Sequence, residues 1–149
     1  MDISEETKER LRNLFDSQLN AALATSKDDE PYCCLVSFLV SQDLRYLVFA
    51  TKRARLKYKQ MEANPSVALL IDNTTNQPDD VTEAISVSVV GTAEDIKRSE
   101  RLSYVDLLAE RHPKLKEFLH SAGTAIIRVS IEKMYVVTNF ESVEVVEPS

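Results

Sequence analysis

The sequence predicts a mainly β fold, an antiparallel barrel with peripheral α-helices, in a single domain over residues 1–149. Two observations predict it. The expected strands cluster in runs, without the regular alternation with helices that a doubly wound parallel sheet requires. The length of 149 residues suits one domain, and a hydrophobic fraction of 44% is enough to build a core at that size.

The first expected element is an amphipathic helix over residues 4–20. Ser4 is placed to accept a hydrogen bond at its N-terminus, and the two glutamates that follow suit the positive end of the helix dipole. The spacing of the apolar side chains predicts that one face packs on the core. That face comprises Leu11, Leu14, Phe15 and Leu19.

Three strands in close succession are expected to form an antiparallel meander. They cover residues 21–26, 31–40 and 45–51, and short polar turns separate them. The second strand contains the adjacent Cys33 and Cys34, whose side chains point to opposite faces of a strand and so do not pair with each other. We expect one cysteine to be buried and the other to face the opposite way.

The middle of the chain predicts one helix and two strands. The helix covers residues 54–63 and ends at an Asn-Pro pair, because proline biases the preceding residue away from helix. A buried strand over residues 66–72, a polar loop over 73–81 and a second strand over 84–93 follow. Gly91 in the last of these predicts a bulge or a close approach of two backbones.

The last third predicts two helices and two strands. The first helix covers residues 99–111, and its apolar side comprises Leu102, Val105 and Leu108. The second begins at Pro113, which suits a first helical position, and ends before Gly123. The strands cover residues 124–130 and 134–144.

Composition and motifs exclude several classes of function. A net charge of −6 and a pI near 5.0 argue against a duplex-binding protein. There is no glycine-rich nucleotide motif, since the chain has only two glycines, and no paired histidines or cysteines suited to a metal. No signal peptide or membrane span is expected, which makes the cytoplasm the expected location. No acid–base pair stands out, so the chemistry of an enzyme here would belong to a cofactor.

Residues 51–59 carry an abrupt reversal of charge. They contain five of the eighteen basic residues and no acid, which leaves 13 basic against 24 acidic residues elsewhere. The stretch lies where a strand ends and a helix begins, and a helix N-terminus offers free N–H groups to an anion. It therefore predicts a phosphate site, to which the Thr51 hydroxyl adds a donor. The alternatives are a solvated helix face and, less favoured because only Tyr58 could stack on a base, a nucleic-acid patch.

A set of motifs follows a fixed order along residues 10–140: Ala24-Thr25-Ser26, Leu35-Val36-Ser37-Phe38, Tyr46 to Thr51, Met61 to Ile71 and Val87 to Glu94. The most specific element is Thr51, then Lys57, then Asn64-Pro65 before an apolar strand. In this order and spacing, the sequence resembles the pyridoxamine 5'-phosphate oxidase-like, FMN-binding split-barrel family. The resemblance covers nearly the whole chain.

The resemblance implies an antiparallel split β-barrel that holds FMN at the interface of a homodimer. Thr51 and Lys57 match positions that hold the flavin phosphate in the family, and Arg55 lies in the same turn. The residues expected to bind the cofactor are Leu35, Val36, Ser37, Phe38, Ala50, Thr51, Arg55, Leu56, Lys57 and Ser86. The resemblance further implies an oxidoreductase acting on a small molecule that it does not identify, with no side chain marked as catalytic.

Departures from the family and rival functions qualify this expectation. The chain has no tryptophan and none of the C-terminal arginines of the vitamin-oxidising members, so oxidation of pyridoxine phosphate is not expected. One alternative is a non-catalytic flavin carrier, or a haem binder with His112 or His120 as axial ligand. Another is an interaction protein whose cofactor site is empty.

Overall fold

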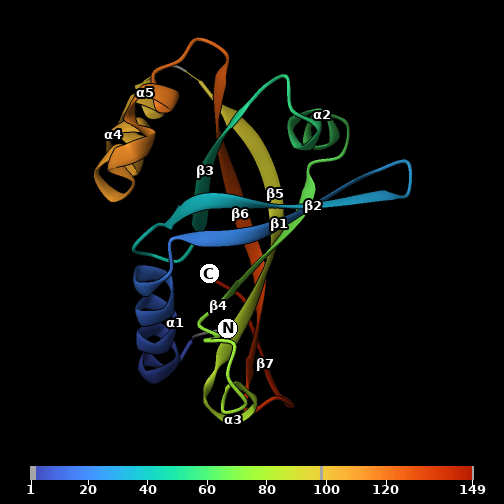
Figure 1. Ribbon diagram of the computed structural model, residues 1–149, viewed down its shortest axis with the longest axis vertical. Coiled ribbons are helices and arrows are strands. Elements are labelled where there is room, and N and C mark those ends of the chain that lie inside the picture. Colours follow the sequence, from blue (N-terminus) through green and yellow to red (C-terminus); the bar gives the residue numbers. More distant parts are fainter. Residues whose placement is uncertain (1–2, 98, 149) are drawn as a thin grey trace.

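The computed structural model describes residues 3–97 and 99–148 and shows a closed antiparallel β-barrel surrounded by helices (Figure 1). Its strands are β1 (Asn20–Lys27), β2 (Glu30–Val40), β3 (Tyr46–Lys52), β4 (Ser66–Asp72), β5 (Ile85–Ile96), β6 (Thr124–Thr138) and β7 (Ser142–Val146). Among the described residues their order is β3-β2-β1-β4-β5-β6-β7, and pairing of β3 with β6 closes the barrel. The predicted fold class is confirmed.

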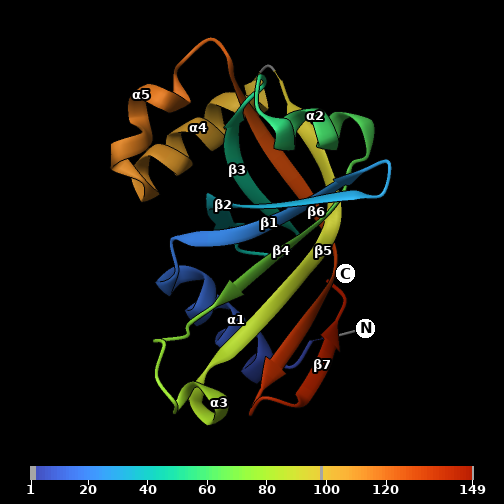
Figure 2. The same cartoon turned by 45° about the vertical axis from the view of Figure 1, so that its right-hand side comes forward.

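Helices lie at both ends of this barrel. They are α1 (Glu5–Ser17), α2 (Leu56–Ala63), α3 (Asp80–Glu83), α4 (Ser99–Arg111), the 3-10 turn η1 (Pro113–Leu115) and α5 (Lys116–Leu119). Helix α2 and the α4–α5 pair lie at one end, on either side of β3, whereas α3 and β7 lie at the other (Figures 1 and 2). In the part of the chain that the structure describes, no helix is long and apolar enough to cross a bilayer.

Helix α1 packs on the main core as its pattern predicts. The Ser4 hydroxyl accepts a hydrogen bond from the Thr7 N–H at 3.2 Å, which caps the helix. Its buried side chains Leu11, Leu14 and Phe15 join the core cluster of the barrel. The prediction that Leu19 belongs to this face was wrong. The helix ends at Ser17, and Leu19 lies in the extended link to β1 with 54% of its surface exposed.

A two-residue turn joins β1 to β2. Lys27 pairs with Glu30, and the two residues between them, Asp28 and Asp29, have φ of 51° and 64°. Two successive left-handed residues form the hairpin turn whose twist matches that of the flanking strands. Aspartate tolerates this conformation because its short polar side chain can hydrogen-bond locally. The turn therefore forms without glycine.

Gly91 combines a bulge with a close approach of two backbones. The β5–β6 register shifts between Val90 and Gly91, which confirms the predicted bulge. A Cβ added to Gly91 would lie 2.1 Å from the carbonyl oxygen of Ser130 on β6. Only glycine lets the strands approach this closely at the bend of the barrel.

Two segments differ from the sequence-based expectation. The predicted loop 73–81 overlaps the start of the short helix α3, and the Asp80 carboxylate accepts hydrogen bonds from the Thr75, Asn76 and Gln77 N–H groups. These bonds order a segment whose polarity predicts only a loop.

The two predicted last strands are instead one long β6 and a separate β7. The break falls at the left-handed residues Asn139 and Phe140, whose φ values are 48° and 66°.

Two side-chain predictions are also corrected. Leu102 is 66% exposed, because α4 packs on the barrel only through a narrow stripe that contains Val105 and Leu108. Cys33 is exposed and Cys34 is half-buried against the core. They face opposite ways as expected, but neither is fully buried, because β2 has no partner strand on its β3 side at this end.

Arg111 fixes the end of α4 to the rest of the molecule. Its guanidinium donates to the carbonyl oxygens of Phe38 at 3.0 Å, Phe15 at 2.6 Å and Gln18 at 2.5 Å. Two of these acceptors are free carbonyls at the C-terminal end of α1. The adjacent His112 is buried, with its Nε2 2.8 Å from the same Phe38 oxygen. These contacts hold the end of α4, which η1 and α5 follow, against β2 and α1.

Candidate functional site

The candidate site lies where the barrel splits between β2 and β3. The described ladder between these strands runs only from Phe38–Phe49 to Val40–Leu47. Outside this ladder, β2 before Phe38 pairs with β1 alone, and β3 after Phe49 pairs with β6 alone. The strand edges facing the split carry backbone N–H and C=O groups without a partner strand. A groove of about 330 Å³ opens there, lined by Leu35, Val36, Ser37, Ala50, Thr51, Lys52, Arg55, Lys57, Leu115 and Phe118.

One end of the groove is cationic. Lys52, Arg55 and Lys57 line it, and none of its described lining residues carries a carboxylate. Among the ion pairs of the described residues, none involves these three side chains. A turn closed by the Arg55 N–H on the Lys52 carbonyl oxygen at 3.1 Å leads into α2, which begins at Leu56. The free N–H groups of this helix start add to the positive potential.

Thr51 lies at the base of the cationic end. Only 1% of its surface is exposed. Its hydroxyl makes one hydrogen bond among the described residues, a long one of 3.4 Å to the Lys52 carbonyl oxygen. A donor held this weakly is available to an anion that enters the groove.

The rest of the groove lining is largely apolar. Leu35 on β2 is 71% exposed, and the neighbouring Val36 is buried. Leu115 and Phe118, both half-buried, close this side from the α5 segment. Leu35, Leu115 and Phe118 thus give this part of the groove an apolar lining.

The fold gathers most of the predicted cofactor-binding residues into this groove. Seven of the ten line it: Leu35, Val36, Ser37, Ala50, Thr51, Arg55 and Lys57. Leu56 begins α2 next to the groove but is not among its lining residues. Their binding of a cofactor stays a prediction.

Phe38 and Ser86 are placed differently from the other predicted residues. The Phe38 side chain is fully buried, edge-on against Phe15, and its carbonyl oxygen is occupied by Arg111 and His112. Its side chain therefore lies in the core, outside the groove. Ser86 lies near the start of β5 at the α3 end of the barrel, in a separate hollow. Within one chain, Ser86 does not reach the groove.

Three lining residues were not among those expected from the sequence: Lys52, Leu115 and Phe118. Lys52 could have been predicted from the sequence, since it belongs to the basic stretch and follows Thr51 directly. Leu115 and Phe118 show only the pattern of a helix that packs on the core. They lie about sixty residues from the basic stretch, and only the fold brings them to it.

Family membership follows from comparison with known proteins. A model of the pyridoxamine 5'-phosphate oxidase family matches residues 7–138. The chain belongs to this family. No curated protein matches it.

Solved structures of the same fold include proteins described by different ligands. The chain is similar to a haem-binding protein from Mycobacterium smegmatis, with a TM-score of 0.84 and 13% identity over 99% of this chain and 60% of that one. It is also similar to an FAD-binding protein from Mesorhizobium loti, with a TM-score of 0.71 and 20% identity over 86% of this chain and 90% of that one. General Stress Protein 26 from Bacillus anthracis is similar with a TM-score of 0.74 and 19% identity, over 95% of this chain and 98% of that one. The chain thus spans less than two thirds of the Mycobacterium protein, and these likenesses show the fold alone.

Neither histidine of this oxidase-family chain lines the groove. His112 is buried and its Nε2 contacts the Phe38 carbonyl oxygen. His120 is exposed after α5, with its Nδ1 2.8 Å from the Lys116 carbonyl oxygen. Among the described residues, no group of three or more His, Cys, Asp or Glu side chains is placed to hold a metal ion.

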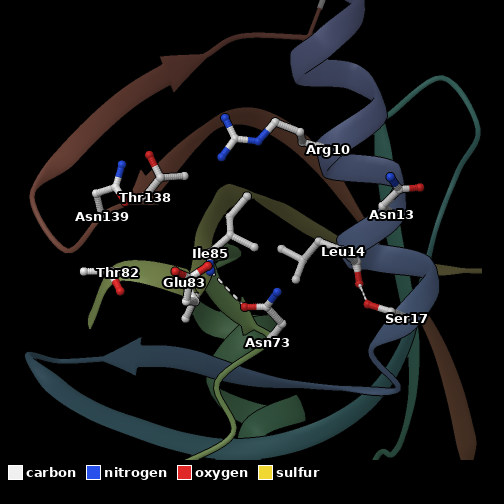
Figure 3. A pocket seen from close by; sticks show the side chains of 11 residues that line it. Arg10, Asn13, Leu14, Ser17, Asn73, Thr82, Glu83, Ile85, Thr138 and Asn139 are labelled. Carbon is white, nitrogen blue, oxygen red and sulfur yellow. Dashed lines mark hydrogen bonds between the residues drawn. The ribbon is translucent and has the colours of Figure 1, made fainter. Parts of the chain in front are cut away.

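A larger cavity lies elsewhere in the molecule (Figure 3). It measures about 510 Å³ and is bounded by α1, the start of β5 and the end of β6. One cation, Arg10, and one acid, Glu83, line it together with amide and hydroxyl side chains, above a floor that includes Leu14 and Ile85. It lacks the excess of positive charge found in the groove, and no predicted cofactor-binding residue lines it. We therefore take the groove as the candidate site.

Proposed function

We propose that the groove binds FMN and that the protein is an FMN-dependent oxidoreductase acting on a small molecule. The observation that carries this proposal is the combination of a cluster of cationic side chains with apolar side chains in one groove at the split of the barrel. FMN has the matching chemistry, a phosphate dianion and a large planar ring. Membership of the oxidase family supports the same assignment.

The residues present fit this group. Lys52, Arg55 and Lys57 would hold the phosphate through charge-assisted hydrogen bonds, with the Thr51 hydroxyl as a further donor. The unpaired edge of β2 at residues 35–37 would lie beside the ring and offer backbone donors to it. Bound FMN would supply electron transfer, and the protein would bind it, orient it and limit the access of water.

A non-catalytic haem binder is the second candidate, favoured by the likeness to the haem-binding protein from Mycobacterium smegmatis. Haem needs an axial ligand from the protein. Both histidines lie outside the groove lining, which argues for a flavin there. The cytoplasmic location expected from the sequence stays a prediction.

Titration with FMN and with riboflavin tests the proposed function. Riboflavin has the same ring and ribityl chain but lacks the phosphate. If the cationic end holds the phosphate, FMN should bind at least about 10- to 150-fold more tightly, because each charged hydrogen bond of this kind contributes about 1.5–3 kcal/mol. Quenching of flavin fluorescence measures both dissociation constants. Equal affinities would contradict the assignment of the cationic end.

A homodimer would cover an exposed apolar surface next to the groove. Registered neighbours on a sheet share a face, and one such row crosses six strands: Leu35, Ala22, Leu70, Ser88, Tyr135 and Val145. Only Ser88 and the Tyr135 hydroxyl are polar in this row, which we call the outer sheet row. Leu35, Leu70 and Val145 are exposed. Since Leu35 also lines the groove, a second copy packed here would adjoin the cofactor.

The dimer proposal gives a direct prediction for Leu70 at the centre of the outer sheet row. Leu70→Arg should convert a dimer into a monomer, because the charge would be buried without a partner at the interface. Leu107→Arg on α4 is the matched control, since Leu107 is similarly exposed but lies outside the row. Size-exclusion chromatography with light scattering measures the mass. A wild-type monomer, or a dimer that survives Leu70→Arg, would contradict this interface.

A further inference from the structure

The basic stretch is divided between two sides of the turn before α2. Lys52, Arg55 and Lys57 line the groove, whereas Arg53 and Tyr58 contact Asp95 on β5. The Arg53 guanidinium donates to both carboxylate oxygens of Asp95, from Nε at 3.1 Å and from Nη2 at 3.3 Å. The Tyr58 hydroxyl donates to Asp95 Oδ2 at 2.9 Å. One carboxylate therefore holds both ends of the segment that carries Arg55 and Lys57.

Asp95 is well placed to act as a fixed point. It lies within the long β5–β6 ladder, in register with Ile127, and only 14% of its side chain is exposed. The Arg53 N–H also donates to the Gly123 carbonyl oxygen at 3.0 Å, where the chain enters β6. The turn is thus attached to β5 and to the start of β6 through residues that do not line the groove.

The protonation states of both donors favour this arrangement. The hydrogen bonds to Asp95 raise the pKa of Arg53. Burial, and then the hydrogen bond to Asp95, raise the pKa of Tyr58 above its usual value. Both groups therefore remain protonated donors throughout the neutral range.

We propose that Asp95 is a positioning residue for the phosphate end of the groove. Through Arg53 and Tyr58 it fixes the turn and the first turn of α2, so that Arg55 and Lys57 are already directed at the groove before a ligand arrives. Long cationic side chains on a loose turn would lose conformational entropy on binding, and a braced turn avoids part of that loss. The inference rests on the proposed binding of FMN.

The variant Asp95→Asn tests this proposal, because two explanations of the role of Asp95 predict opposite changes in FMN affinity. If Asp95 positions the turn, the nearly isosteric asparagine should weaken FMN binding about 5- to 20-fold and leave riboflavin binding unchanged, since only the phosphate contacts suffer. If Asp95 acts only as a nearby negative charge, its neutralisation should tighten the binding of the anionic FMN. Fluorescence titration with both flavins and a thermal melt measure the effects.

Glu62→Gln is the matched control. Glu62 is an exposed acid on α2 that lines the same small hollow as Asp95. It makes no hydrogen bond or ion pair among the described residues, so this variant changes the charge equally without releasing the turn. It should leave the preference for FMN unchanged or slightly increased. Tyr58→Phe, which removes only the hydroxyl contact, should give a smaller loss of FMN affinity and keeps the test available if Asp95→Asn does not fold.

The results separate this inference from the proposed function. FMN affinity that is unchanged or higher in Asp95→Asn, or equal losses for FMN and riboflavin, would overturn the positioning role while FMN binding by the wild type stands. A wild type that binds FMN no more tightly than riboflavin would overturn the phosphate site and the positioning role together.

Discussion

Replacing Lys57 by alanine is expected to weaken FMN binding by about 1.5–3 kcal/mol, roughly a 10- to 150-fold rise in Kd. Lys57 lines the cationic end of the groove from the first turn of α2, and it forms no ion pair among the described residues. Its ammonium is therefore free to make a charged hydrogen bond to the phosphate. Fluorescence titration of the purified variant measures the change.

Lys59→Ala provides the control for this variant. Lys59 carries the same charge on the same helix, but it is exposed and two residues further on, so it does not line the groove. It should change the Kd by less than about twofold, since an exposed charge acts weakly at this range. Equal effects of the two substitutions would mean that Lys57 acts only through general charge, and no effect of either would place the phosphate elsewhere.

Gly91→Ala is expected to destabilise the protein by about 3 kcal/mol or more. The new Cβ would lie 2.1 Å from the Ser130 carbonyl oxygen and 2.8 Å from Val129 Cγ1. The first of these is a backbone atom in the long β6, so relief requires the two strands to separate at the bulge. For a chain of this size the loss corresponds to a fall in Tm of about 6–12 °C. Thermal and urea unfolding measure it.

Gly123→Ala is the matched substitution at the other glycine. A Cβ there has no atom within 4 Å, and neither glycine has a positive φ. Alanine should therefore be neutral or stabilise the fold by up to about 1 kcal/mol, because it reduces the freedom of the unfolded chain. A Gly91 variant as stable as the Gly123 variant would show that the strands are not in this close contact.

Local chemistry explains how much of the fold can be predicted from the sequence. The predicted bounds of β4, at residues 66–72, and of α4, at 99–111, coincide with the observed ones, and the cap by Ser4 begins α1 as predicted. In each of these segments, propensity and apolar spacing agree. The order of the strands and the closure of β3 on β6 depend on contacts between distant segments, which the pattern supports only as a fold class.

The errors arise where a local pattern does not determine the tertiary contact. Leu19 and Leu102 continue an apolar helical face in the sequence, but one lies beyond its helix and the other outside the stripe that touches the barrel. The break between β6 and β7 depends on left-handed Asn139 and Phe140. Phenylalanine gives no sequence signal for that conformation, so the turn was missed.

The candidate site also has a part that the sequence predicts and a part that only the fold brings together. The cationic end could be predicted because Thr51, Arg55 and Lys57 stand close together in the sequence, where a strand meets a helix. The apolar part of the lining includes Leu115 and Phe118, which reach the groove only through the packing of the α4–α5 pair. The separate role of Arg53 could not be predicted, because its partner Asp95 lies on a distant strand.

The absorbance spectrum of the purified protein, recorded after addition of FMN and gel filtration, tests the central claim most directly. Bound FMN should give retained bands near roughly 370 and 450 nm, at about one flavin per chain. A protein that emerges without pigment, or that carries a haem-like band in place of the flavin bands, would contradict the assignment of the groove as an FMN site.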